Sequence, residues 1–197
     1  MPEVAELPEK VRAFVALQVS AQVERAIGGL IDELRAPRDG IKWASRTNLH
    51  LTLKFLGPAV PIAKIDLLKP ELHAVAAETS AFELAAAGVG AFPSLGRPRI
   101  LWVGLKAGAL LDLARRIDEA AARCGFEREQ RPFSGHLTIA RVNSPRGWQR
   151  TRRALEAMRG REFGTSDIRE MTLYRSTLTP QGSIYDALAV FTFTARD

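Results

Sequence analysis

Two short histidine motifs stand out among the 197 residues of this chain. His50 and His136 each open the tetrapeptide His-Leu-Thr-(Leu/Ile), so Thr52 and Thr138 each follow a histidine by two positions. In a β-strand, residues two apart point to the same side. Each motif therefore predicts a strand that presents an imidazole and a hydroxyl on one face and apolar side chains on the other.

Two imidazoles that face each other across a cleft can act as a general base and a general acid near neutral pH. Threonine hydroxyls beside them can donate hydrogen bonds to an anion held between them. A cyclic phosphodiester suits this set, because one imidazole deprotonates the attacking water and the other protonates the departing sugar oxygen. This chemistry requires no covalent nucleophile, metal or other cofactor, and we expect none.

Other chemistries fit the sequence less well. Two histidines are too few ligands for a closed structural zinc site, and the single Cys124 adds no cysteine pair. A serine hydrolase would need a Gly-x-Ser-x-Gly turn, which the sequence lacks. Gly88-Val89-Gly90 is missing the third glycine of a dinucleotide fingerprint, and no Walker lysine motif indicates ATP use.

The elements that must position these motifs form two similar halves, at roughly residues 11–92 and 99–194. Each half reads strand, helix, strand, helix, strand. The first strands, RAFVALQVS and RILWVGLKA, align at an offset of about 88, and the two motifs at 136 − 50 = 86. We therefore predict a single domain over residues 1–197, built from two intertwined α+β lobes related by a pseudo-two-fold axis, with the two motif strands facing each other.

Composition and charge are typical of a folded protein with an anionic partner. Hydrophobic residues make up 46% and charged residues 25% of the chain, and the net charge is +6. Between Arg128 and Arg161 there are nine arginines and two acids, a net of +7, so the remaining residues sum to −1. The arginine-rich helix predicted at 148–158 fits an RNA contact or a solvated outer face equally well. Arginine outnumbers lysine 22 to 6, which a GC-rich genome would also produce.

The sequence predicts a cytoplasmic protein. No apolar run approaches the roughly 18 residues that a membrane span requires, and the acidic, proline-containing N-terminus is unlike a signal peptide. A lone cysteine allows no intrachain disulfide. We expect a monomer that does not associate with membranes.

Several segments of the chain resemble the two-histidine (2H) phosphoesterases. Within that superfamily, HLTLKFLG (50–57) and RPFSGHLTIAR (131–141) closely resemble the RNA 2′,3′-cyclic phosphodiesterases, also called 2′-5′ RNA ligases. RAFVAL, GVGAFPS followed by PRILWVGL, and YRSTLTPQGSIYDAL are similar to further segments of that family, in the same order. The resemblance covers nearly the whole chain and implies a bilobal fold whose two lobes each carry an antiparallel sheet with helices, with the active-site cleft between the lobes.

The resemblance also implies an activity and a set of site residues. The family hydrolyses 2′,3′-cyclic phosphate ends of RNA, for example of tRNA fragments, or of nucleotides, to 2′-phosphates without a metal, and reversibly joins RNA ends through a 2′-5′ linkage. By analogy, His50 would be the acid that protonates the 3′ leaving oxygen and His136 the base that activates water, although a pseudo-symmetric site permits the reverse. Thr52 and Thr138 would bind the phosphate.

Two further family positions are Phe55, expected near the base, and Arg141, expected at the phosphate. Each lies five residues after its histidine, so strict strand alternation puts it on the wrong face. Both reach the cleft only if the strand ends or bulges after the motif. The chain departs from the family at Gly135, where proline usually precedes the second histidine, and this predicts a less firmly held His136.

Two other functions remain open from the sequence. The chain could be a 2H enzyme for another cyclic phosphate, such as an ADP-ribose cyclic phosphate, because pocket loops set substrate choice. It could also be a non-catalytic RNA-binding module on the same fold, although the intact histidine and threonine of both motifs favour an enzyme.

Overall fold

The computed structural model describes residues 8–144, 146–180 and 182–196. The first half of the chain forms β1 (Lys10–Leu17), α1 (Ala21–Leu34), β2 (Ile41–Trp43), the 3-10 helix η1 (Arg46–Asn48), β3 (Leu51–Pro61), α2 (Ile62–Ala77) and β4 (Phe82–Phe92). The second half forms β5 (Ile100–Lys106), α3 (Leu110–Arg123), β6 (His136–Val142), α4 (Trp148–Ala157), β7 (Glu162–Ile168), β8 (Glu170–Thr179) and β9 (Gly182–Thr192).

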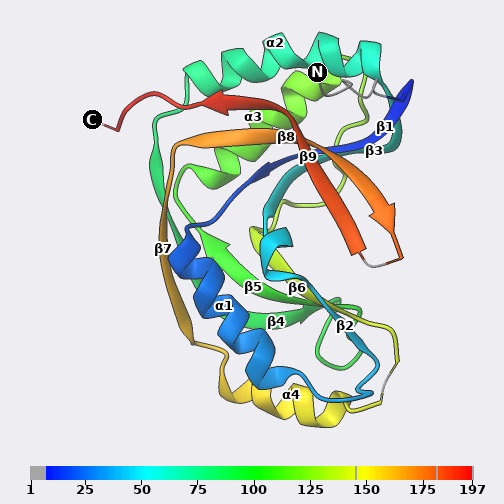
Figure 1. Cartoon of the computed structure of the whole chain (residues 1–197). Coiled ribbons are helices and arrows are strands. Elements are labelled where there is room, and N and C mark those ends of the chain that lie inside the picture. The colour runs from blue at the N-terminus through cyan, green and yellow to red at the C-terminus, as the bar shows by residue number, and fades with distance from the viewer. Residues whose placement is uncertain (1–7, 145, 181, 197) are drawn as a thin grey trace, which may run out of the picture.

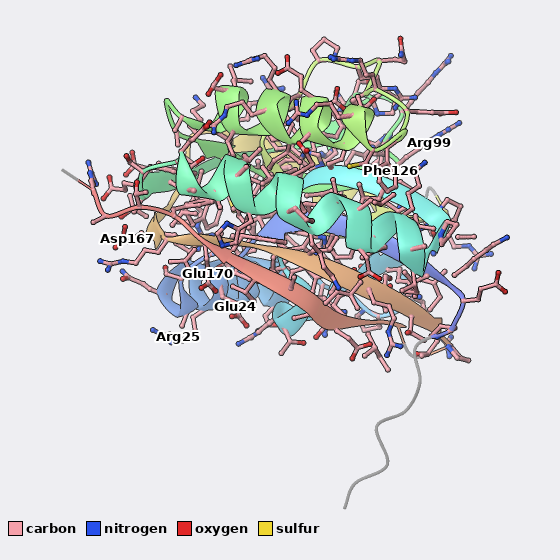
Figure 2. The ribbon with its side chains drawn as sticks, turned by 90° about the horizontal axis from the view of Figure 1, so that it is seen from above. Glu24, Arg25, Arg99, Phe126, Asp167 and Glu170 are labelled. Atoms are coloured by element: carbon pink, nitrogen blue, oxygen red, sulfur yellow. The ribbon has the colours of Figure 1, made fainter. Side chains whose placement is uncertain are left out.

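The strands build two antiparallel sheets (Figure 1). The first sheet has the order β3-β1-β8-β9, and the second has the order β2-β6-β5-β4-β7. Helices α2 and α3 lie beside the first sheet, and α1 and α4 lie at the opposite end of the molecule beside the second (Figure 1). Viewed from above, α2 and α3 run side by side across the molecule (Figure 2). The predicted α+β, bilobal fold is confirmed.

The two halves of the chain exchange elements between the sheets. Strand β4 of the first half joins the second sheet, while β8 and β9 of the second half join the first. Helix α1 follows a strand of the first sheet but packs against β7 of the second, and α3 follows β5 but packs against α2 and β3. This exchange supports the prediction of one domain with intertwined lobes, which stays a prediction.

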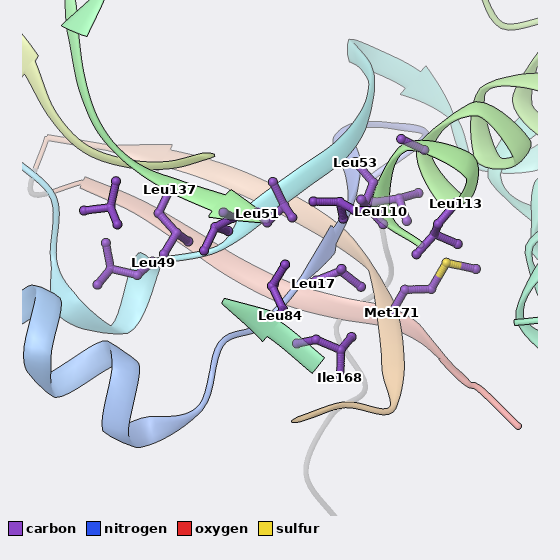
Figure 3. Close-up of a cluster of buried hydrophobic side chains, with 14 of the residues drawn as sticks. Leu17, Leu49, Leu51, Leu53, Leu84, Leu110, Leu113, Leu137, Ile168 and Met171 are labelled. Atoms are coloured by element: carbon purple, nitrogen blue, oxygen red, sulfur yellow. The ribbon is translucent and has the colours of Figure 1, made fainter. Parts of the chain in front are cut away.

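One hydrophobic cluster takes side chains from both sheets and from α3 (Figure 3). Leu51 and Leu137, the second residues of the two motifs, both belong to it and are fully buried. Because alternate residues of a strand face opposite sides, burying these leucines turns the neighbouring motif residues away from the core. The shared core therefore holds the two motif strands in a fixed relation.

The order of strand, helix, strand, helix and strand predicted for each half is observed, but the sequence did not predict β2 or β7 as strands. These are the two edge strands of the second sheet. Edge strands are often short or polar, and β2 has three residues whereas β7 reads EFGTSDI. The Ser20 hydroxyl caps α1, since it accepts a hydrogen bond from the Val23 N–H. None of the helices in the described residues is long and apolar enough to cross a membrane.

Candidate active site

The two motif histidines occupy equivalent places at the starts of neighbouring strands. His50 immediately precedes β3, and His136 is the first residue of β6. The Nδ1–H of His50 donates to the carbonyl oxygen of Asn48 at 2.8 Å, and that of His136 donates to the carbonyl oxygen of Ser134 at 2.7 Å. A carbonyl can only accept, so each bond fixes the neutral imidazole in the tautomer whose Nε2 is free to take a proton.

Aromatic rings enclose the His50 imidazole. The Phe14 ring lies 4.8 Å from it, centroid to centroid, and the Tyr185 ring packs edge-on at 5.0 Å. Phe14 also contacts Tyr174 and Tyr185, so strands β1, β8 and β9 all contribute to this wall. The wall limits rotation of the His50 ring and removes water from one side of it.

His136 has a smaller aromatic support. The Phe92 ring at the end of β4 packs edge-on against it at 5.0 Å, and Phe92 in turn contacts Trp102 at 5.3 Å. Trp102 is the cross-strand partner of Thr138, and its ring covers Gly90, where a Cβ would overlap the indole. The second motif therefore also has an apolar support, built from β4 and β5.

The surroundings of His50 favour its neutral form. Burial lowers the pKa of His50, the bond to Asn48 opposes this, and the positive charge of protonated His136 lowers the pKa further. The two histidines lie at the starts of β3 and β6, which contact each other although they belong to different sheets. A charge on His136 therefore makes His50 a stronger acid.

This depressed pKa makes stability depend on pH. The unfolded chain binds the His50 proton more readily than the folded chain does, so the contribution of His50 is complete above the unfolded pKa of about 6.5 and is lost as pH falls toward the lower folded value. We expect wild type to lose more free energy of unfolding between pH 8 and pH 5 than His50→Asn does, measured by urea titration. Equal losses in the two proteins would contradict this expectation.

A β-bulge follows each motif at the same position. In β3, Ala16 of β1 pairs with Thr52 and Val15 with Lys54, so Leu53 is the extra residue. In β6, Trp102 of β5 pairs with Thr138 and Leu101 with Ala140, which makes Ile139 the extra residue. Each bulged residue lies three positions after its histidine. A bulge shifts the alternation by one, and the residues after it change face.

We call the strand face that carries the histidine and threonine of each motif the motif face. Strict alternation would place Phe55 and Arg141 on the opposite face, but the bulges bring both to the motif face. Phe55 pairs with Phe14, which lies two residues from Ala16, so Phe55 shares a face with Thr52. Arg141 pairs with Ile100, two residues from Trp102, and so shares a face with Thr138. Phe55 is 42% exposed, and the guanidinium of Arg12 lies 4.4 Å from the centroid of its ring.

The pairing also corrects the alignment of the repeat. Ala16 and Trp102 hold equivalent places beside the two motif threonines, an offset of 102 − 16 = 86, which is also the offset of the motifs. The sequence alignment placed the first strands at about 88. The quoted strands begin at Arg12 and Arg99, an offset of 87, so the pairing shifts them by one residue, and a one-residue shift exchanges the two faces of a strand.

Gly135, predicted to hold His136 loosely, is tightly enclosed. Its carbonyl accepts a hydrogen bond from the Leu105 N–H at 2.9 Å. A Cβ at this position would lie 2.7 Å from the Leu105 carbonyl oxygen and 2.8 Å from the Leu110 Cδ2. Glycine is thus required here by a close approach of backbone, and the structure gives no indication of looseness.

Gly135→Ala should therefore reduce both stability and catalysis. Relieving the overlap must move β6 or α3, at a cost of about 1–3 kcal/mol, and His136 is the next residue. We expect a lower urea midpoint and a lower kcat. Gly29→Ala is the matched control, because its Cβ meets nothing within 4 Å in α1 and should raise stability by about 0.5–1 kcal/mol. An unchanged midpoint and kcat in Gly135→Ala would contradict the prediction.

The basic helix α4 lies near α1, at the end of the molecule opposite to α2 and α3 (Figure 1). Arg150 donates to the carbonyl of Leu34, Arg152 pairs with Glu156, and Arg161, after the helix, pairs with Glu33. Trp148 and Leu155 are buried, and Met158 is half-buried. These internal partners favour the solvated outer face over an RNA contact.

Sequence reasoning did not identify the aromatic residues and backbone carbonyls around the histidines. Phe14, Phe92, Trp102 and Tyr185 come from four different strands, so no local spacing connects them with the motifs. All four lie in segments that resemble the family, and this was the available signal. Among the described residues, no three histidine, cysteine, aspartate or glutamate side chains gather closely enough to hold a metal ion.

Comparison with known proteins agrees with this geometry. A family model described as the 2′-5′ RNA ligase superfamily matches residues 21–179. An Archaeoglobus fulgidus protein named RNA 2′,3′-cyclic phosphodiesterase is 35% identical over 91% of this chain and 99% of its own length. An Aquifex aeolicus protein of the same name is 32% identical over 92% of this chain and 96% of its own.

Solved structures show the same architecture. The TT0787 protein of Thermus thermophilus superposes with a TM-score of 0.77 at 27% identity, over 94% of this chain and 100% of that one. Escherichia coli LigT in complex with 3′-AMP superposes with a TM-score of 0.74 at 28% identity, over 94% and 99% of the two chains. Together with the paired histidine strands, these matches show that the chain belongs to the 2′-5′ RNA ligase superfamily.

Proposed function

We propose that this protein is an RNA 2′,3′-cyclic phosphodiesterase that opens the cyclic phosphate at an RNA or nucleotide end to a 2′-phosphate. The observation that carries the proposal is the pair of imidazoles at equivalent strand starts, each with Nδ1 bonded to the carbonyl two residues earlier. The names of the curated relatives support the substrate class, and the binding of 3′-AMP by Escherichia coli LigT supports a nucleotide ligand.

In the proposed reaction, the Nε2 atom of His136 takes a proton from a water molecule whose oxygen attacks phosphorus. The bond from phosphorus to the 3′ oxygen breaks, and His50 gives that oxygen a proton from its Nε2. The product carries a 2′-phosphate and a 3′-hydroxyl, and the two imidazoles have exchanged protonation states. Thr52 and Thr138 donate hydrogen bonds to the non-bridging oxygens, where negative charge develops.

The same arrangement accounts for ligation. A 5′-hydroxyl from a second RNA end takes the place of the attacking water, gives its proton to His136, and forms a 2′-5′ linkage. Burial lowers the pKa of His50, and the negative charge of a bound phosphate raises it again, so substrate binding favours the protonated His50 that acts as the acid. Phe55 lies beside the base of the terminal nucleotide, and Arg141 contacts the phosphate.

The deciding experiment is product analysis on an oligonucleotide that ends in a 2′,3′-cyclic phosphate, with EDTA present. We expect a 2′-phosphate, and an unchanged rate in the chelator. A 3′-phosphate product, or loss of activity on chelation, would contradict the mechanism. Binding without turnover would identify an RNA-binding module, and faster turnover of an ADP-ribose cyclic phosphate in a parallel reaction would reassign the substrate. Action as a monomer in the cytoplasm stays a prediction.

A further inference from the structure

Two cations lie directly opposite each other at the edge of the second sheet. Lys42 of β2 and Arg141 of β6 are Cα partners in the antiparallel ladder, and both side chains are exposed. Directly opposite side chains of such a pair lie on the same face with their Cβ atoms about 4.5–5.5 Å apart, and like charges there are destabilising. The sheet therefore holds an unfavourable pair that a bound anion would relieve.

No acidic side chain neutralises this pair within the described residues. Neither Lys42 nor Arg141 takes part in an ion pair there. The nearby carboxylate of Asp39 is buried and already accepts bonds from the Ile41 N–H, the Ala36 N–H and the Trp43 Nε1–H. Burial raises the pKa of Asp39, but those bonds outweigh it and hold the pKa below its ordinary value. The carboxylate is therefore bound by donors of its own turn and forms no ion pair with Lys42 or Arg141.

Lys42 also lines a cavity of about 490 Å³ beside β2, together with Arg35 and Arg38. Within the described residues these two arginines form no ion pair either. We call Lys42, Arg35 and Arg38 the β2 basic groove. Asp39 also lines this cavity, so its charged side chains sum to 3 − 1 = +2 beside the Arg141 position.

The bulge at Ile139 determines on which face of the sheet Arg141 and Lys42 lie relative to the candidate site. Because Arg141 shares a face with Thr138, its partner Lys42 shares that face too. Thr138 and Arg141 are three positions apart, but their partners Trp102 and Ile100 are only two apart on β5, about 7 Å of strand. Arg141 lies on the motif strand itself, and Lys42 lies one strand farther out, on the edge strand β2, so the groove lies where the next part of a substrate held at the histidines would extend.

We propose that the β2 basic groove, through Lys42, binds a backbone phosphate of the RNA strand on the 5′ side of the cyclic end. The inference rests on the proposed function. A mononucleoside 2′,3′-cyclic phosphate has one phosphate, which the histidine site takes, whereas a longer strand supplies a second phosphate for Lys42. The protein therefore selects oligonucleotide ends over cyclic mononucleotides, and the groove is its specificity determinant.

The test compares kcat/KM for a mononucleoside 2′,3′-cyclic phosphate and for a hexanucleotide ending in the same nucleotide. Wild type should favour the hexanucleotide. Lys42→Gln should lower the hexanucleotide-to-mononucleotide ratio about two- to fivefold, the range expected for one exposed ionic contact, and Lys42→Glu should lower it further. The slope of log kcat/KM for the hexanucleotide against log salt should become shallower by about 0.7 in Lys42→Gln, as for one lost contact to single-stranded phosphate.

Lys69→Gln is the matched control, since Lys69 is a lysine of α2 outside this sheet. It should keep the wild-type ratio and salt slope. Mononucleotide turnover by each Lys42 variant reports whether it folds. Equal losses on both substrates, or an unchanged ratio in Lys42→Gln and Lys42→Glu, would overturn the inference and leave the proposed function standing. Wild type that turns over neither substrate would refute the proposed function instead.

Discussion

His136→Ala should lower kcat/KM for a 2′,3′-cyclic phosphate by about 10²- to 10⁴-fold, the usual contribution of one acid or base group, and leave the protein folded. The half-exposed imidazole contributes little to the core, and its neighbour Leu137 keeps the strand in place. His50→Ala should cost a similar factor in rate. Kinetics with a cyclic phosphate, together with thermal unfolding curves, measure both effects.

The third histidine provides the control. His73 is exposed on α2, away from both motif strands, and His73→Ala should keep full activity. The double variant His50→Ala/His136→Ala should lose little more than either single variant, because groups that act in one step are not additive. Activity within tenfold of wild type in either single variant would exclude the two-histidine mechanism.

The second large effect concerns stability, at the buried ion pair between Lys54 of β3 and Asp118 of α3. Lys54 is 6% and Asp118 17% exposed, and their charged atoms lie 2.5 Å apart. Lys54 also donates to the Glu127 carbonyl, and the Asp118 carboxylate accepts from the Glu129 N–H. Burial would raise the pKa of Asp118, but these hydrogen bonds lower it below its ordinary value.

Asp118→Leu leaves the Lys54 ammonium buried without a counter-charge, and we expect it to cost about 3–5 kcal/mol of folding free energy. Lys54→Met leaves the carboxylate in the same position and should cost a comparable amount. The double variant Lys54→Met/Asp118→Leu should be more stable than either single variant, because no unpaired charge remains. Urea titration of the four proteins gives the coupling energy directly.

Lys69→Met is the comparison for this pair. Its partner Asp66 lies one helical turn away, and both side chains are well exposed at 39% and 56%, so its loss should cost at most about 1 kcal/mol. Lys54 follows the bulged Leu53 and precedes Phe55, so we also expect the single variants to lose activity. A Lys54→Met protein as stable as Lys69→Met would show that the buried pair is dispensable.

The sequence by itself predicted the chemistry that we propose for the site. The types and spacing of His50, Thr52, His136 and Thr138 indicated acid and base catalysis on an anion, because side chains two apart in a strand share a face wherever the strand is placed. The duplicated order of strands and helices likewise predicted two lobes. Both conclusions rest on local periodicity, which the linear chain records directly.

Only the tertiary structure decided how the site is completed. Phe55 and Arg141 reach the motif face through bulges that appear only in the pairing with β1 and β5. Tyr185 reaches His50 from the other end of the chain, and Gly135 is required by the approach of Leu105 from another strand. These features depend on contacts between residues distant in sequence, which a periodic pattern does not encode, and the facing cations Lys42 and Arg141 are of the same kind.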